Sequence, residues 1–274
     1  METAHLGIDG GGSGCRGLLV LPDGAAFEAQ GGPANAFSDL SGAATALGEL
    51  AKELTKAANW SGPLHCVAGV AGCRLPAQGQ ALADALPLAA KVVDDAVIAA
   101  RGALGAGDGT VIGLGTGAFF CRQNAGEFTQ VSGWGLNLGD EGSGAWLGRE
   151  AVRAALAAFD GRGAADALTD AILDNAEHPL RRFGRATPAE FAALAPLVID
   201  HAETATGAAL ITAIGEEITR ALSALGTTAD ETLVLTGGLG TGLKRFLPDP
   251  LAARCSEPLA DALDGALSLA RALP

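Results

Sequence analysis

Apolar residues along the first part of the chain alternate between short runs, which are typical of strands, and stretches with helical spacing. In one such stretch Ala43, Leu47, Leu50, Leu54 and Ala57 recur every four or three residues, which predicts an amphipathic helix. Turn signals rich in glycine and proline separate the short runs. The pattern predicts strands at 5–9, 15–21, 25–30, 64–72 and 90–95, and helices at 43–58, 76–86 and 96–106.

The second part of the chain repeats this design. A strand, a glycine turn and a second strand occur at 6–21 and again at 110–122, and each copy leads into a further strand and then helices. The alternation of strands and helices predicts an α/β fold. We expect a lobe boundary near 100–108. Helices are predicted at 144–159, from Pro188, at 206–225 and at 259–270, and residues 231–240 are predicted as a strand that enters another glycine turn.

The charge of the chain excludes some partners. It has 274 residues and a net charge of −13, with 18 Lys and Arg against 31 Asp and Glu. This balance argues against nucleic acid and against an anionic membrane surface, which both need a basic footprint. An acidic protein that handles phosphate must use backbone N–H groups, helix ends or a metal ion. The scattered cysteines and histidines predict neither disulfides nor a metal site, and without an apolar span or leader we expect a cytoplasmic protein.

Two glycine turns carry the first candidate chemistry. Gly12, Gly14 and Gly17 fit the dinucleotide pattern G-x-G-x-x-G, and a similar match begins at Gly113, but strands rather than helices follow both. We therefore expect turns between antiparallel strands, where glycine allows positive φ and brings backbone N–H groups close to phosphate. Ser13 and Thr116 add hydroxyl groups. Ordinary hairpin turns are the alternative interpretation.

Three acids stand at predicted strand ends. A carboxylate at Asp9, beside the first turn, suits the water shell of a phosphate-bound Mg²⁺, and a turn-capping role is the alternative. Asp94 and Asp95 follow a strand, at the sheet edge where α/β active sites lie. One of them suits a general base for an alcohol that attacks phosphorus, whereas the other could cap the next helix. We favour Asp95 as the base.

The segment "GWGLNLGDEGSGAWLGRE" (133–150) is the most distinctive. A ligand with many hydroxyl groups needs carboxylates and amides at fixed positions, and a glycine-rich loop lets them crowd together. Alternatively, "DEGS" is only a helix N-terminal cap, although a cap does not explain so many glycines. Asn35, in the loop "GPANAFSD", is a further hydrogen-bonding candidate or a turn former.

These motifs, in this order, resemble the N-acetylglucosamine kinase and BadF/BadG-type ATPase family of the actin/hexokinase-like superfamily. The similarity rests on "GIDGGGSGCRGLLV", "VIGLGTGAFFCR", the segment at 133–150 and "LVLTGGLG". It implies a two-lobed fold, each lobe a mixed β-sheet flanked by helices, with ATP and sugar in the cleft between lobes 1–104 and 105–274. The last helix, about 258–272, is expected to pack back on the N-terminal lobe.

The resemblance also implies roles for single residues. Asp95 would be the base for a sugar 6-hydroxyl, and Asp9 would lie near Mg²⁺. The implied phosphate and adenosine contacts are Gly11, Gly12, Ser13, Gly115, Thr116, Gly117, Gly237 and Gly238. The implied sugar contacts are Asn35, Gly133, Trp134, Gly135, Asp140 and Glu141, with Asp95 among them.

The implied activity is ATP-dependent phosphorylation of N-acetylglucosamine or glucosamine, in a homodimer. Two alternatives stay open: an ATPase that energises a partner enzyme, against which the scattered cysteines argue, and a non-catalytic sugar sensor.

Overall fold

The computed structural model describes residues 2–174 and 178–274. The chain divides into two compact units, each built around a five-stranded sheet. The first unit comprises Met1–Asp108, Gln123–Phe128 and Pro258–Pro274, and the second comprises Gly109–Arg122 and Thr129–Glu257. Two mixed sheets with helices on their faces confirm the predicted α/β fold class.

The sheet of the first unit has the strand order β3-β2-β1-β4-β5. β1 and β2 form the predicted antiparallel hairpin, β2 also pairs with β3 antiparallel, and β1, β4 and β5 run parallel. Its strands are β1 (Ala4–Gly10), β2 (Cys15–Val20), β3 (Ala26–Gly31), β4 (Leu64–Val70) and β5 (Lys91–Asp94).

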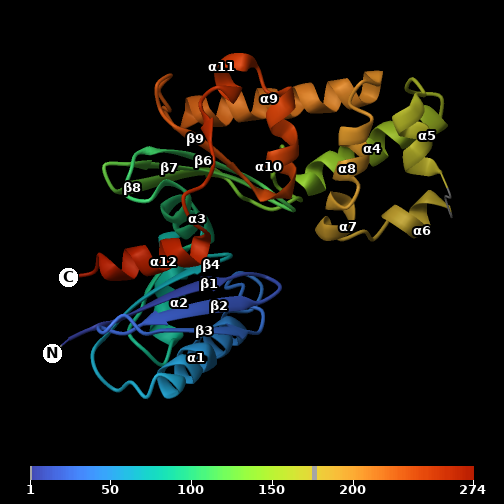
Figure 1. The fold of residues 1–274 in the computed structure, drawn as a ribbon. Coiled ribbons are helices and arrows are strands. Elements are labelled where there is room, and N and C mark those ends of the chain that lie inside the picture. Colours follow the sequence, from blue (N-terminus) through green and yellow to red (C-terminus); the bar gives the residue numbers. More distant parts are fainter. Residues whose placement is uncertain (1, 175–177) are drawn as a thin grey trace. The chain divides into compact units, whose positions relative to one another are not determined.

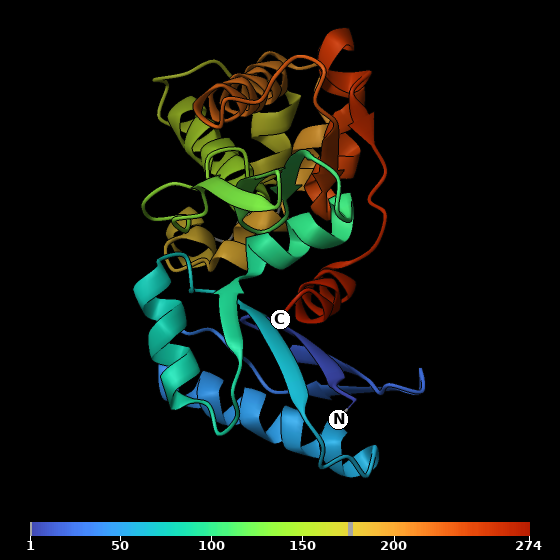
Figure 2. The ribbon, with the colours of Figure 1, turned by 90° about the vertical axis from the view of Figure 1, so that its left-hand side faces the viewer.

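Helices cover both faces of this sheet (Figure 2). α1 (Leu40–Ala57) packs on β2 and β3, and α2 (Pro76–Ala85) packs on β5. α12 (Ala262–Arg271) lies on the other face, against β1, β4 and α3 (Asp95–Leu104). The core between α1 and the sheet is aliphatic, with Leu6, Leu19, Leu47, Leu50 and Leu54 buried. The predicted apolar stripe on α1 therefore faces the sheet.

The sheet of the second unit has the order β10-β9-β6-β7-β8 (Figure 1). Its central strand, like β1, has a hairpin partner on one side and a parallel strand on the other, so the predicted duplication is confirmed. Its strands are β6 (Gly109–Leu114), β7 (Ala118–Asn124), β8 (Glu127–Ser132), β9 (Leu233–Thr236) and β10 (Cys255–Ser256).

Helices of the second unit pack against this sheet, and the core between them includes Phe120 of β7 and the helical residues Leu147, Ile214 and Ile218. Ser143 begins the long α4 by accepting a hydrogen bond from the Trp146 N–H. The helices are α4 (Gly144–Phe159), α5 (Ala167–Leu173), α6 (Pro179–Phe183), α7 (Pro188–Ala192), α8 (Ala195–Asp200), α9 (Ala205–Ala224), α10 (Gly237–Leu243), η1 (Lys244–Phe246) and α11 (Asp249–Ala252).

One sequence expectation needs correction. The strand predicted at 231–240 ends at Thr236, and a helix follows instead of a glycine turn. A helix begins at Pro188 as predicted, and other short helices that were not predicted lie in the described part of 178–205; residues 175–177 lie outside the described residues. Across the described ranges, no single helix is long and apolar enough to cross a membrane. The pair Pro188–Asp200 and Ala205–Ala224, bent by 112°, meets that test only when combined.

Candidate functional site

The carboxyl ends of three parallel strands meet at one edge of the first sheet. The register places Gly10 opposite Val70, and Val70 opposite Asp94, so β1, β4 and β5 end at the same level. Asp9, Asp94 and Asp95 therefore gather at this edge. Ligands of α/β proteins bind outside such carboxyl ends.

Asp95 is the most perturbed acid at this edge. Burial, the charge of Asp94, a hydrogen bond with the Asp94 side chain and the charge of Asp9 together raise the pKa of Asp95 to about 7, although the Ala96 N–H opposes the shift. Asp94 Oδ1 accepts a hydrogen bond from the Ala96 N–H at 3.2 Å and caps α3. Asp94 thus fills the helix-capping role, and Asp95 is left as a half-buried carboxyl whose proton is exchangeable near neutral pH.

A thiol beside the two acids takes no part in such chemistry. Burial first, and then the charges of Asp94 and Asp95, raise the pKa of Cys73 to about 12. Because the thiolate is the reactive form, Cys73 is inert at neutral pH.

Asp9 does not cap the turn that follows it. It faces Arg16 across the β1–β2 hairpin, and Arg16 Nη2 donates to Asp9 Oδ2 at 2.8 Å. Arg16 Nη1 also donates to Asp261 Oδ2 at 3.1 Å, so the guanidinium lies between two carboxylates. Arg16 was not anticipated from the sequence, although its register opposite an acid is the signal that could have identified it.

The first glycine turn is held by backbone bonds: the Gly11 N–H donates to the Gly14 carbonyl, and the Ala34 N–H to the Gly11 carbonyl. None of Gly11, Gly12 and Gly14, nor Gly115 or Gly117 in the second turn, has the positive φ that was expected to explain them. A Cβ on Gly12 or Gly115 would meet no atom within 4 Å. The absence of side chains thus leaves open space beside these two residues rather than relieving strain.

Asn35 lies in the loop after β3. Its Oδ1 accepts hydrogen bonds from the Phe37 and Ser38 N–H groups at 3.0 and 3.1 Å. The turn-forming interpretation of Asn35 is therefore right. These bonds also fix the direction of its amide.

In the second unit, the N-terminus of α4 holds the second glycine turn. The Gly144 N–H donates to the Gly115 carbonyl at 2.8 Å, and the Ala145 N–H donates to the Thr116 carbonyl at 3.2 Å. The first two N–H groups of the helix, which helix geometry leaves unpaired, are thereby satisfied by the turn. Ser143 supplies the cap, so the capping interpretation of "DEGS" holds for its serine.

Glycines in the loop before α4 serve a different purpose. Gly133, Gly135 and Gly142 all have φ near +80°, and two residues with side chains, Ser132 and Asp140, have φ of 62° and 58°. A chain that turns this way repeatedly needs glycine, because other residues rarely adopt the left-handed region. The left-handed backbone conformation therefore accounts for these glycines, which helix capping alone does not explain.

Asp140 lies at the centre of this loop and is buried, at 7% exposure. Its Oδ1 accepts a hydrogen bond from the Gly135 N–H at 2.9 Å. Burial and Glu141 raise the pKa of Asp140 above its ordinary value, although the N–H groups of Gly135, Ala118 and Trp134 oppose this. Trp134 is half-exposed on the same loop.

A cavity of about 490 Å³ opens beside the second glycine turn. Gly115, Thr116, Gly144 and Gly238 line it, as do residues of α7, α8 and α10 that sequence reasoning missed. These further lining residues are Ala192, Ala195, Pro196, Ile199, Asp200, Leu239 and Gly242. The capping box formed by Thr187 and Glu190 is the sequence signal that could have located this helical wall.

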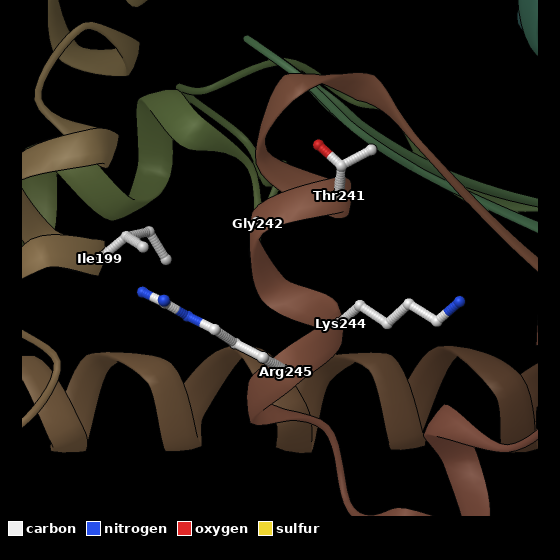
Figure 3. Close-up of a pocket in the computed structure, with 5 residues that line it drawn as sticks. All are labelled: Ile199, Thr241, Gly242, Lys244 and Arg245. Carbon is white, nitrogen blue, oxygen red and sulfur yellow. The ribbon is translucent and has the colours of Figure 1, made fainter.

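An adjoining cavity of about 530 Å³ shares Ile199 and Gly242 with the first. Figure 3 shows the Arg245 side chain extending toward Ile199, whereas Lys244 points to the opposite side of α10 and η1. Lys244 Nζ instead lies 3.4 Å from the Cys255 carbonyl and 3.8 Å from Glu257 Oε1. Both residues line this cavity, but only the Arg245 side chain extends toward Ile199.

One acid, Asp9, has the chemistry to hold the water shell of a magnesium ion that arrives with a nucleotide, and its Oδ2 already accepts a hydrogen bond from Arg16. Within the described residues no three His, Cys, Asp or Glu side chains are placed to hold a metal by themselves. Mg²⁺ commonly binds one or two carboxylates together with substrate phosphates and water. The carboxylate of Asp9, beside the open turn at Gly12, suits that arrangement.

The structure therefore groups the predicted residues in two sets. Asp9, Gly11–Ser13, Asn35 and Asp95 belong to the first unit. Gly115–Gly117, Gly133–Gly135, Asp140, Glu141, Gly237 and Gly238 belong to the second. Gly237 is a tight backbone contact, because its φ is +82° and a Cβ would crowd the Leu114 carbonyl.

Comparisons with known proteins agree with the resemblance. Glucosamine kinase GspK of Vibrio cholerae is 27% identical to this chain, in an alignment that covers 97% of this chain and 95% of GspK. An N-acetylmuramic acid/N-acetylglucosamine kinase of Clostridium acetobutylicum is 42% identical over 84 residues, 30% of this chain and 28% of that one. A solved structure from Chromobacterium violaceum, assigned as an N-acetylglucosamine kinase, is 31% identical and superposes with a TM-score of 0.83 over 97% of this chain and 98% of its own.

The family comparison covers most of the chain. The BadF/BadG/BcrA/BcrD ATPase family matches residues 6–250, which include both glycine turns, Asp94, Asp95 and the loop before α4. The chain belongs to the BadF/BadG/BcrA/BcrD ATPase family.

Proposed function

We propose that this protein is an ATP-dependent kinase that phosphorylates an amino sugar, glucosamine or N-acetylglucosamine, at its 6-hydroxyl. The relatives that match along nearly the whole chain act on such sugars by name, and this supports the class of substrate. The family supports the use of ATP.

In this proposal Asp95 takes the proton from the sugar hydroxyl as its oxygen attacks the γ-phosphorus. The P–O bond to ADP breaks, and the proton stays on Asp95 until solvent removes it. A base with a pKa near neutrality suits this role, since it is partly ionised and can still hold the transferred proton. Mg²⁺, when bound with the nucleotide, would offset the phosphate charge, and Asp9 is the residue we assign to its water shell.

The nucleotide is assigned to the two adjoining cavities of the second unit. Gly115, Thr116 and Gly117 would face the phosphates, and Gly238 with Gly237 would lie against adenosine. The Arg245 guanidinium, which extends over the neighbouring cavity, is placed to stack on the base. In the first unit, Gly11, Gly12 and Ser13 would approach the phosphates from the open turn.

The sugar is assigned to Asn35 in the first unit and to the loop before α4 in the second. Gly133, Trp134, Gly135, Asp140 and Glu141 supply an aromatic face, backbone groups and two carboxylates, which suit a ring with several hydroxyl groups. The acidic character of this loop would also suit a protonated amine.

The observation that carries the proposal is the placement of Asp95. A half-buried carboxyl with a raised pKa lies at the carboxyl edge of a parallel sheet, beside a second acid and an open glycine turn. Carboxyls with a strongly raised pKa cluster at catalytic sites, which supports an enzymatic role.

The test measures ADP release from purified protein with Mg-ATP and a panel of amino sugars. Release that depends on glucosamine or N-acetylglucosamine, with the 6-phosphate identified by NMR, supports the proposal. Release without sugar indicates an ATPase, and sugar binding without release indicates a sensor. Asp95→Asn should lose about 10²–10⁴-fold in kcat while still binding sugar.

A further inference from the structure

One side chain connects the loop before α4 to the second glycine turn. The Gly135 N–H donates to Asp140 Oδ1 at 2.9 Å, which ties the carboxylate to the loop. The other oxygen lies against the turn, because a Cβ on Gly117 would fall 2.9 Å from Asp140 Oδ2. The Ala118 N–H, at the end of that turn, also stabilises the ionised carboxylate.

The backbone at Asp140 is bound as firmly as its side chain. The Asp140 carbonyl accepts a hydrogen bond from the Ser143 N–H at 2.9 Å, directly before the helix whose first N–H groups hold Gly115 and Thr116. Asp140 is also one of few described residues other than glycine with positive φ. Such a conformation persists only where the surroundings impose it, and it is common at functional sites.

We infer that Asp140 is a positioning residue that couples the two substrate loops, so that the phosphate turn and the sugar loop hold their shapes together. The inference rests on the proposed function, in which Gly115–Gly117 face nucleotide and Gly133–Gly135 face sugar. It goes further than a sugar contact, because a residue that only touched sugar would have no effect on the nucleotide.

The chemistry explains why an aspartate is needed here. An ionised carboxylate accepts several hydrogen bonds and donates none, so it can satisfy N–H groups from two loops at once. Hydrogen bonds to a charged acceptor are stronger than neutral ones. Asparagine would direct an NH₂ group at one of those N–H donors and lose one of the two connections.

The first test needs no ligand. Hydrogen exchange of the free protein should show faster exchange in Asp140→Asn than in wild type, by roughly tenfold, in peptides covering both 115–118 and 133–136. Faster exchange in 133–136 alone overturns the inference. Asp160→Asn, an exposed aspartate at the other end of α4, is the matched control and should change neither peptide.

The second test separates coupling from contact. Titration calorimetry should show that Asp140→Asn weakens MgADP, measured without sugar, by roughly tenfold. A second quantity is the ratio of the MgADP Kd without sugar to the Kd with N-acetylglucosamine or glucosamine bound. This ratio should be closer to one in Asp140→Asn than in wild type. MgADP binding equal to wild type overturns the inference and leaves Asp140 as a sugar contact.

Asp140→Gly is a second variant for the case in which Asp140→Asn folds poorly, since glycine accepts φ of 58° but lacks the carboxylate. The same losses in both variants support the inference, whereas wild-type behaviour of Asp140→Gly overturns it. If wild-type protein does not bind MgADP, the proposed function fails, and exchange in the two peptides still decides whether Asp140 joins the loops.

Discussion

Asp95 should cost the protein stability in order to serve as a base. A carboxyl that keeps its proton up to a pKa of about 7 in the folded state, against 3.8 ordinarily, binds more protons folded than unfolded between these pH values. The contribution of Asp95 to the free energy of unfolding must therefore fall as pH rises from about 4 to 7. The difference in pKa corresponds to at most about 4 kcal/mol at pH 8.

Asp95→Asn removes the destabilisation that ionised Asp95 causes, because asparagine is nearly isosteric and never ionises. We expect the variant to be more stable than wild type at pH 8, by up to about 4 kcal/mol. It should match wild type at about pH 3, which lies below both pKa values, so that Asp95 is mostly protonated in both states. Urea unfolding, followed by far-UV circular dichroism at both pH values, measures the difference. Activity should fall as stability rises.

The matched variant is Asp94→Asn. Asparagine also caps helices, so α3 keeps its N-cap, while the negative charge beside Asp95 is lost. The pKa of Asp95 should fall, and the acid limb of the kcat/KM profile should move to lower pH. A loss of stability in Asp95→Asn at pH 8, or no change of the acid limb in Asp94→Asn, would refute the electrostatic reasoning.

Three further predictions concern other parts of the molecule. Arg245→Ala should raise the Kd for MgADP about two- to thirtyfold, because stacking of a cation on an aromatic ring contributes about 0.5–2 kcal/mol. Lys244→Ala should not raise this Kd, since the Lys244 side chain points to the opposite side of the helix. Equal effects of the two variants would contradict the placement of adenine beside Arg245. Gly237→Ala should lower the free energy of unfolding by about 1–3 kcal/mol, because the φ of Gly237 is +82° and a Cβ would crowd the Leu114 carbonyl. Gly238→Ala should not lower it, since a Cβ on Gly238 would meet no atom within 4 Å. Urea titrations of the two variants measure the difference. Burial first, then His65 and Arg271, lower the pKa of His5, so the contribution of His5 to stability should decline as pH falls below 6.5. The difference in stability between His5→Leu and wild type should therefore change between melting curves at pH 5 and pH 7, in favour of the variant at pH 5.

The sequence was informative wherever a local pattern determines the structure. The spacing of Leu47, Leu50 and Leu54 predicted α1 because one face of that helix must be buried. The two hairpins were predictable because glycine turns between apolar runs leave few other conformations. The doublet Asp94–Asp95 could be placed at a strand end, and the cap assigned to one of its members, from the same local rules.

Other features were missed because the spacing of apolar residues alone does not determine them. The pairing of Asp9 with Arg16 follows from the register of two strands, and the link from Arg16 to Asp261 joins positions 245 residues apart. The helical wall of the cavity lies in a segment whose short helices have no complete apolar stripe. His5 and His65 are distant in the chain, yet their ring centres lie 5.7 Å apart because β1 and β4 pair in parallel register.

The two sheets share one strand order, but the chemistry at their carboxyl ends differs. In the first unit these ends carry the acids Asp9, Asp94 and Asp95, which suit proton transfer and the water shell of a cation. In the second unit β6 leads into the turn at Gly115 and β9 into the glycine pair at Gly237, whereas Glu257 follows β10. Backbone N–H groups at the two glycine segments can receive phosphate oxygens without a basic side chain. In the proposed function, the acids of the first sheet therefore serve the sugar hydroxyl and the cation, and the glycine segments of the second sheet serve the nucleotide.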